Sequence, residues 1–130
     1  AWFDLDDVQW SNFQLPGGAL ISSDAHANPE TTWYSELILL HALTTAACSL
    51  RDPMLIDRAK RGATYVAREI QPDHASSQPW AIHAMLLDES TVSMADLMLH
   101  SAGVQQPSTL DSVSVLLLAD ALLGLKRISR

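Results

Sequence analysis

The stretch from Asn28 to Ile70, NPETTWYSELILLHALTTAACSLRDPMLIDRAKRGATYVAREI, decides the fold. Asn28 can accept hydrogen bonds from the free amides of a helix start, and Pro29 suits the first helical position because its missing N–H has no partner there. Asp52 and Pro53 form a second pair of a capping residue and proline, at a tight turn in the middle of the stretch. The stretch therefore predicts two antiparallel helices, each opened by a capping residue followed by proline.

The two predicted helices differ in apolar character. The first, 29–50, is apolar almost all round, which predicts burial on several sides. The second, 53–70, is amphipathic, with an apolar face and a charged face on opposite sides. The residues expected on its charged face are Asp57, Arg58, Lys60, Arg61, Arg68 and Glu69. We expect an outer helix packed on an inner one.

The rest of the chain also has helical patterns. A loop is expected over 71–78, followed by a short helix, 79–88, and by a helix, 92–102, that Gly103 ends in the left-handed conformation. Ser108 and Asp111 resemble a capping box before a last helix, 109–129. No stretch alternates with period two for long enough to predict a strand.

Three short segments repeat a pattern about 40 residues apart. They are Leu40-His41-Ala42-Leu43, Ile82-His83-Ala84-Met85 and Ala119-Asp120-Ala121-Leu122. This spacing is typical of a pair of helices with two turns. We predict an all-α fold of stacked antiparallel helical hairpins, part of an α/α solenoid or an incomplete α/α toroid. Residues 1–130 form a single helical domain in this prediction, with residues 1–27 as an irregular N-terminal arm.

Composition narrows the choice of partners. The 130 residues carry 15 acidic and 8 basic side chains and a net charge of -7, so nucleic acid is not an expected partner. The longest apolar run, Val115 to Ala119, is far shorter than the roughly 20 residues that a transmembrane helix needs. The single cysteine, Cys48, excludes an intrachain disulfide and is expected to be a small buried apolar residue. The compartment is not indicated.

Part of the second helix and the segment after it resembles a known repeat. The residues are Arg61-Gly62-Ala63-Thr64-Tyr65-Val66, then Gln71-Pro72-Asp73 and finally Trp80. They are similar to the glutamine–tryptophan repeat of squalene and terpene cyclases. The resemblance implies an α/α toroid, a shape that also occurs in protein prenyltransferases and in noncatalytic repeat domains.

A second resemblance lies in the N-terminal arm. Asp4-Leu5-Asp6-Asp7 is similar to the acidic motif of squalene-type cyclases, which implies a protonated carboxylic acid that donates a proton to an alkene. A raised carboxyl pKa of this kind needs a buried cluster of like charges. Because Asp4, Asp6 and Asp7 lie close to the terminus with no helical pattern after them, we favour a solvated acidic arm.

The repeat also aligns three polar side chains: His41, His83 and Asp120. Two imidazoles with one carboxylate would suit zinc binding or general acid–base catalysis. Single polar residues on apolar helices more often satisfy a neighbouring carbonyl or loop amide, and we favour this interpretation. We therefore predict neither a metal nor a cofactor.

Aromatic residues form another candidate group. Trp33, Tyr34 and Trp80 come at predicted helix starts, where they could form the rim of a site for a sugar or an apolar chain. Packing in the core or at the rim is the simpler interpretation.

Two functions are consistent with these patterns. The first is a noncatalytic helical-repeat module for protein interaction or for completing a larger chain, with a protein partner or self-association. The alternative is a fragment or divergent member of a terpenoid-cyclase-like α/α-toroid enzyme. Whether the chain is an enzyme stays open at this point.

Overall fold

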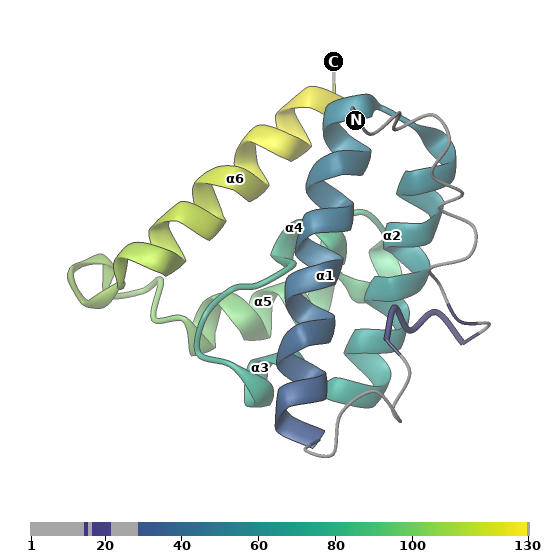
Figure 1. Cartoon of the computed structure of the whole chain (residues 1–130). Helices are drawn as coiled ribbons and strands as arrows, with labels where there is room; N and C mark the ends of the chain where they lie inside the picture. Colours follow the sequence, from purple (N-terminus) through teal and green to yellow (C-terminus); the bar gives the residue numbers. More distant parts are fainter. Residues whose placement is uncertain (1–14, 16, 22–28, 130) are drawn as a thin grey trace, which may run out of the picture.

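The computed structural model describes residues 15, 17–21 and 29–129, and in these residues the predicted all-α class is confirmed (Figure 1). The described part contains six α-helices and no strand. The α-helices are α1 (Pro29–Leu50), α2 (Pro53–Tyr65), α3 (Pro72–Ala75), α4 (Ile82–Met85), α5 (Val92–Ser101) and α6 (Ser112–Ile128). A π-helix, η4 (Val66–Ile70), and two 3-10 turns, η5 (Glu89–Thr91) and η6 (Pro107–Thr109), complete the order. None of the described helices is long and apolar enough to cross a membrane.

The predicted hairpin forms with the expected boundaries. α1 covers 29–50, and the second helix runs from Pro53 to Ile70 because η4 continues α2 without a break. Asp52 caps α2 by accepting a hydrogen bond from the Met54 amide at 2.9 Å. Arg51 takes the left-handed conformation at φ 51°, which turns the chain sharply between the two helices. Asn28, the expected cap of α1, lies outside the described residues.

α1 is the inner helix around which the others pack. Its Leu37 and Leu40 are fully buried against Val66 of η4 and Met85 of α4 in one apolar core. Cys48 is also fully buried, as predicted.

One residue expected on the charged face of α2 was predicted wrongly. Arg58 is buried, because it lies three residues after Leu55 and four before Gly62, on the stripe that faces the core.

The segment that follows the hairpin, 71–88, differs from the prediction. The expected loop over 71–78 contains α3, and the expected helix over 79–88 shortens to α4. Ala81 has a left-handed φ of 59° just before α4, so a regular helix cannot begin at Pro79. α5 and its left-handed end at Gly103, with φ 77°, agree with the prediction.

The predicted capping box before the last helix is also wrong. Asp111 itself caps α6 by accepting a hydrogen bond from the Ser114 amide at 2.7 Å. Ser108 lies instead in the turn η6, so α6 starts three residues later than expected.

α6 packs on α1 with both helices running in the same direction. Asp120 contacts His41 of α1, and seven residues later Arg127 donates to the Ser49 hydroxyl at 2.7 Å. Between these contacts lies Gly124, whose missing side chain would meet the Cys48 Cβ at 3.3 Å. Figure 1 shows the N-terminal half of α6 slanting away from α1.

Of the predicted arm, 1–27, the described residues are 15 and 17–21, and they form a turn and bends that pack on the hairpin. The buried Glu36 carboxylate of α1 accepts hydrogen bonds from the amides of Leu20 and Ile21. Gly18 has φ 100°, and an added Cβ would stand 2.6 Å from the Arg61 carbonyl oxygen. This segment is therefore held between α1 and α2.

Gly18→Ala should lower the free energy of unfolding by about 1–3 kcal/mol, because the new Cβ combines a strained backbone with a clash against the backbone of α2. The matched control is Gly17→Ala, where an added Cβ has nothing within 4 Å. Urea denaturation of both variants measures the difference. Equal stability of the two variants would contradict the docking of this segment.

Glu36 predicts a pH dependence of stability. Burial raises the pKa of Glu36 above its ordinary value, although the hydrogen bonds from Leu20 and Ile21 lower it in part. A group with a raised pKa in the folded state contributes stability below its unfolded pKa and loses that contribution as the pH rises through the folded pKa. We expect the stability of the wild type relative to Glu36→Gln to increase as the pH is lowered through this window. Urea midpoints of both proteins at a series of pH values measure it, and a constant difference would refute the expectation.

Candidate functional site

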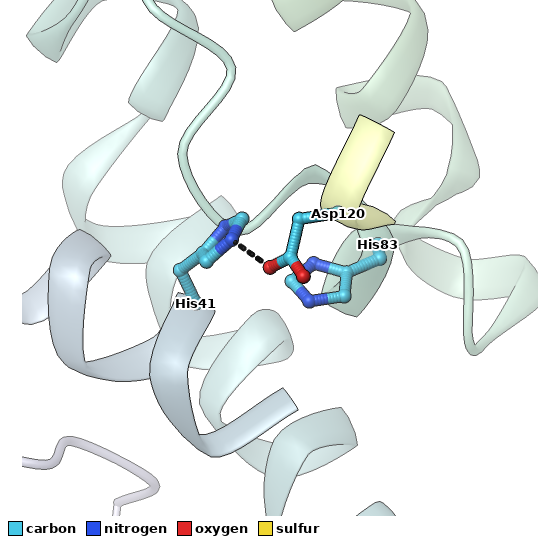
Figure 2. Close-up of side chains that lie close together, drawn as sticks. All are labelled: His41, His83 and Asp120. Atoms are coloured by element: carbon cyan, nitrogen blue, oxygen red, sulfur yellow. Dashed lines mark hydrogen bonds and ion pairs between the residues drawn. The ribbon is translucent and has the colours of Figure 1, made fainter. Parts of the chain in front are cut away.

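Three of the predicted site residues meet in space although they are far apart in sequence. His41 comes from α1, His83 from α4 and Asp120 from α6 (Figure 2). One ligand atom from each residue lies within 4.8 Å of the other two. His83 is fully buried and His41 nearly so, whereas the Asp120 side chain is 40% exposed. The group is therefore buried at the two histidines and partly exposed at Asp120.

The hydrogen bonds of His41 define where its proton lies. Its Nδ1 accepts a hydrogen bond from the Ala81 amide at 3.0 Å, so Nδ1 carries no proton. Its Nε2 lies 2.7 Å from Asp120 Oδ2 and must donate to it. His41 is therefore a neutral imidazole with its proton on Nε2.

The hydrogen bonds of Thr45 define where the proton of His83 lies. The Thr45 hydroxyl donates its one proton to Asp120 Oδ2 at 2.7 Å. It also lies 3.0 Å from His83 Nε2, and since its proton is already used it must accept the proton of Nε2. His83 therefore carries its proton on Nε2 as well. Its Nδ1 is left as a buried acceptor without a hydrogen-bond partner.

The charges agree with this arrangement of protons. Burial and, to a lesser extent, the neighbouring His41 lower the pKa of His83 to about 3, although Asp120 acts in the opposite direction. Burial alone would raise the pKa of Asp120, but the hydrogen bonds from Thr45 and His41 together outweigh it and hold the pKa below its usual value. The network thus contains one carboxylate and two neutral imidazoles.

This geometry limits the chemistry of the cluster. Both ring nitrogens of His41 are in use, so His41 is not free to act as a general base. Asp120 binds His41, but the other ring nitrogen of His41 faces the Ala81 amide rather than a nucleophile, which differs from a nucleophile–His–Asp arrangement. Pairing of His41 with the Ala81 amide is the role expected of a polar side chain that satisfies a loop. What remains available is the lone pair of His83 Nδ1 and the exposed edge of Asp120.

Two of the three aromatic candidates lie beside this network. Trp80 Nε1 donates to the Tyr34 hydroxyl at 3.0 Å, and the two rings meet edge to face with centroids 6.0 Å apart. Trp80 also meets the His41 ring edge to face, with ring centroids 5.6 Å apart. Trp33 is 39% exposed. Trp80 thus packs on the His41 ring, and Tyr34 packs on Trp80.

Of the other residues that the sequence singles out, Gln71 and Cys48 lie in the described part of the chain. Asp4, Asp6 and Asp7 lie outside the described residues. Gln71, part of the cyclase resemblance, takes a left-handed φ of 54° and ends η4. Burial raises the pKa of the Cys48 thiol, which disfavours a reactive thiolate.

The cluster depends on two residues, Thr45 and Gly124, that were not predicted from the sequence. Thr45 lies one helical turn after His41 on the same face of α1, and this spacing of four was the available signal. Gly124 lies one turn after Asp120, and an added Cβ would stand 3.5 Å from His83 Cδ2. No sequence pattern indicated that the Ala81 amide would complete the network.

Comparison of the chain with models of protein families, with curated proteins and with solved structures finds no match in any of the three. The resemblance of Arg61 to Trp80 to the cyclase repeat therefore stays a prediction.

Thr45→Val tests the hydrogen bonds of the network. Valine keeps the shape of threonine but leaves the buried His83 Nε2–H without an acceptor, so we expect the free energy of unfolding to fall by about 1–3 kcal/mol. The control is Thr64→Val on the exposed face of α2, where the hydroxyl donates only to the Lys60 carbonyl of its own helix. Urea denaturation compares the two, and an equal effect at both positions would rule out the network as drawn.

Proposed function

We propose that this chain is a noncatalytic helical module that associates with a second copy of itself through the outward face of α6. The observation that supports the proposal is the exposure of large apolar side chains on this helix. Leu116 is 68% exposed, Leu122 67% and Leu123 55%. Exposed apolar surface that forms a continuous patch is typical of protein association.

Five exposed apolar side chains of α6 form one stripe. Val115, Leu116, Ala119, Leu122 and Leu123 all face outward, and their spacings of three, four and seven residues put them on one side of the helix. The opposite side, with Leu117, Ala121 and Gly124, is buried on the body of the protein. α6 is thus apolar on both sides, and only one of them is covered within the chain.

The pattern of the stripe favours a second copy as the occupant. Ala119 lies at its centre, and large residues follow at equal distances on either side: Leu116 with Leu122, and Val115 with Leu123. A two-fold axis at Ala119 would pair two α6 helices antiparallel, so that each large side chain packs across from its counterpart. The small Ala119 allows the helices to approach closely at the axis.

Charges at the ends of the stripe support the same arrangement. Asp111 precedes α6, and Lys126 and Arg127 lie in its last turn. An antiparallel pair centred on Ala119 sets Asp111 beside Lys126 of the second copy at both ends of the interface. Antiparallel packing also places the positive end of each helix dipole near the negative end of the other.

Leu116→Asp should convert a wild-type dimer into a monomer, because the substitution buries an unpaired carboxylate at the interface. Light scattering during size-exclusion chromatography measures the mass of each species. Leu97→Asp on α5 is the control, since Leu97 is 50% exposed but lies away from the stripe, and it should remain a dimer.

Cysteine cross-linking tests the position of the axis. A residue on a two-fold axis meets its own copy, so Ala119→Cys should form a disulfide-linked dimer on mild oxidation. Ala42→Cys, exposed on α1, should stay monomeric on a nonreducing gel. A monomeric wild type, or equal cross-linking at both positions, would refute the proposed interface.

A terpenoid-cyclase-like α/α-toroid enzyme is the alternative, and it has less support in the described residues. Its acidic motif lies outside them. A surface hollow of about 290 Å³ beside Arg61 is lined by charged and small side chains, among them Lys60 and Arg68, rather than by aromatic ones. A site for a terpenoid chain needs an apolar lining, so the association module is the function we favour.

A further inference from the structure

Within the cluster of His41, His83 and Asp120, one buried acceptor has no hydrogen-bond partner. His83 Nδ1 has no partner, although the residue is fully buried and its Nε2–H is donated to Thr45. Buried polar atoms are nearly always hydrogen-bonded, and an exception needs an explanation. A lone pair on a neutral imidazole whose other nitrogen donates a hydrogen bond is the usual state of a metal ligand.

Two further ligand residues lie beside His83. His41 and Asp120 each offer a donor atom within the same 4.8 Å group, and Figure 2 shows the three side chains converging from three segments. Two imidazole nitrogens with one carboxylate oxygen suit zinc and related transition ions. Magnesium and calcium prefer oxygen ligands alone.

We propose that His41, His83 and Asp120 bind one divalent transition-metal ion of the zinc class. The three side chains supply three ligands, and the partly exposed side of Asp120 leaves the fourth position open to water or to a small ligand. The Thr45 hydroxyl acts as a positioning group, because it holds His83 Nε2–H and so keeps Nδ1 free.

Binding requires a shift of one proton on His41. Its Nε2 must give up the proton now donated to Asp120, and this proton moves to Nδ1, so the ring stays neutral. Nδ1–H would then face the Ala81 N–H, which lies 3.0 Å away. Reversal of the Trp80–Ala81 peptide removes this conflict, since it turns the Trp80 carbonyl oxygen toward Nδ1.

The backbone at Ala81 is suited to such a reversal. Ala81 has φ 59°, a left-handed conformation that is uncommon for a residue with a Cβ. Turning the peptide over moves this φ to the negative side. The hydrogen bond that the Ala81 amide donates to His41 Nδ1 thus holds Ala81 in the metal-free conformation, and metal binding releases it.

The donor atoms must also move together. With zinc bond lengths of about 2.0–2.1 Å, tetrahedral ligands lie roughly 3.3 Å apart, whereas the widest separation here is 4.8 Å. The hydrogen-bonded pair of His41 Nε2 and Asp120 Oδ2, now at 2.7 Å, opens as the ion replaces the proton. From a tetrahedral spacing of roughly 3.3 Å, the widest separation must close by about 1.5 Å and the hydrogen-bonded pair must open by about 0.6 Å.

Titration with Co²⁺ tests the proposal, with the full chain expressed without a polyhistidine tag. We expect visible absorption bands of four-coordinate Co²⁺ that saturate at one ion per chain and disappear when Zn²⁺ displaces it. Asp120→Asn and His83→Gln should each weaken Co²⁺ binding by at least about tenfold. His100→Gln, an exposed histidine on α5, is the control and should bind like the wild type.

A second readout follows the backbone and is independent of the absorption. On addition of Zn²⁺ to the wild type, the Ala81 amide resonance should shift strongly, and in Asp120→Asn it should not. Because His83 is fully buried and its variant can fail to fold, the decision rests on the partly exposed Asp120. Absence of saturable binding by the wild type, or unchanged affinity in Asp120→Asn, would overturn the proposal.

Discussion

The Asp120 carboxylate is the interaction on which the arrangement of the helices depends. Its Oδ2 accepts hydrogen bonds from Thr45 and His41 of α1 at 2.7 Å each, and Thr45 connects it to His83 of α4. Three segments that lie far apart in sequence are thereby held in one position relative to one another. A hydrogen bond to a charged group contributes about 1.5–3 kcal/mol, and leaving such a group unpaired costs more. A helix of leucines alone could slide on α1, whereas a helix that carries Asp120 has one favourable position.

The same constraint explains why the surrounding groups are small or aromatic. Gly124 lets α6 approach Cys48 and His83 closely enough for Asp120 to reach α1. Trp80 packs edge to face on His41, and the Ala81 amide occupies the nitrogen that faces away from Asp120. Every proton in the network is therefore assigned by its neighbours. The one group left over, His83 Nδ1, is what distinguishes a purely structural network from a site that can take a ligand.

The hairpin could be predicted from local sequence because its signals are local. Asp52, Pro53 and the apolar pattern of α1 fix the start and the burial of each helix within a few residues. α4 could not be predicted in the same way, since its length is set by the left-handed turn at Ala81, and that turn is held by a side chain 40 residues earlier. Arg58 was misplaced for a related reason, as helical spacing put it on the buried stripe while its charge suggested the surface.

The candidate site could also be predicted only in part. The repeat pattern aligned His41, His83 and Asp120, and these residues do converge, although the four-residue α4 is not the hairpin helix that the pattern suggested. Thr45 could not be predicted because the sequence does not distinguish it from its neighbour Thr44. The Thr44 hydroxyl donates to the Leu40 carbonyl of its own helix. Which nitrogen of each histidine holds the proton depends on atoms from other segments and was beyond any sequence pattern.

The central claim is that the network has one arrangement of protons, and long-range ¹H–¹⁵N NMR of the histidine rings measures it directly. In the metal-free protein at neutral pH, we expect His41 and His83 both to be neutral with the proton on Nε2 and with Nδ1 unprotonated. A proton on Nδ1 of His41, or a doubly protonated ring at either position, would contradict the account.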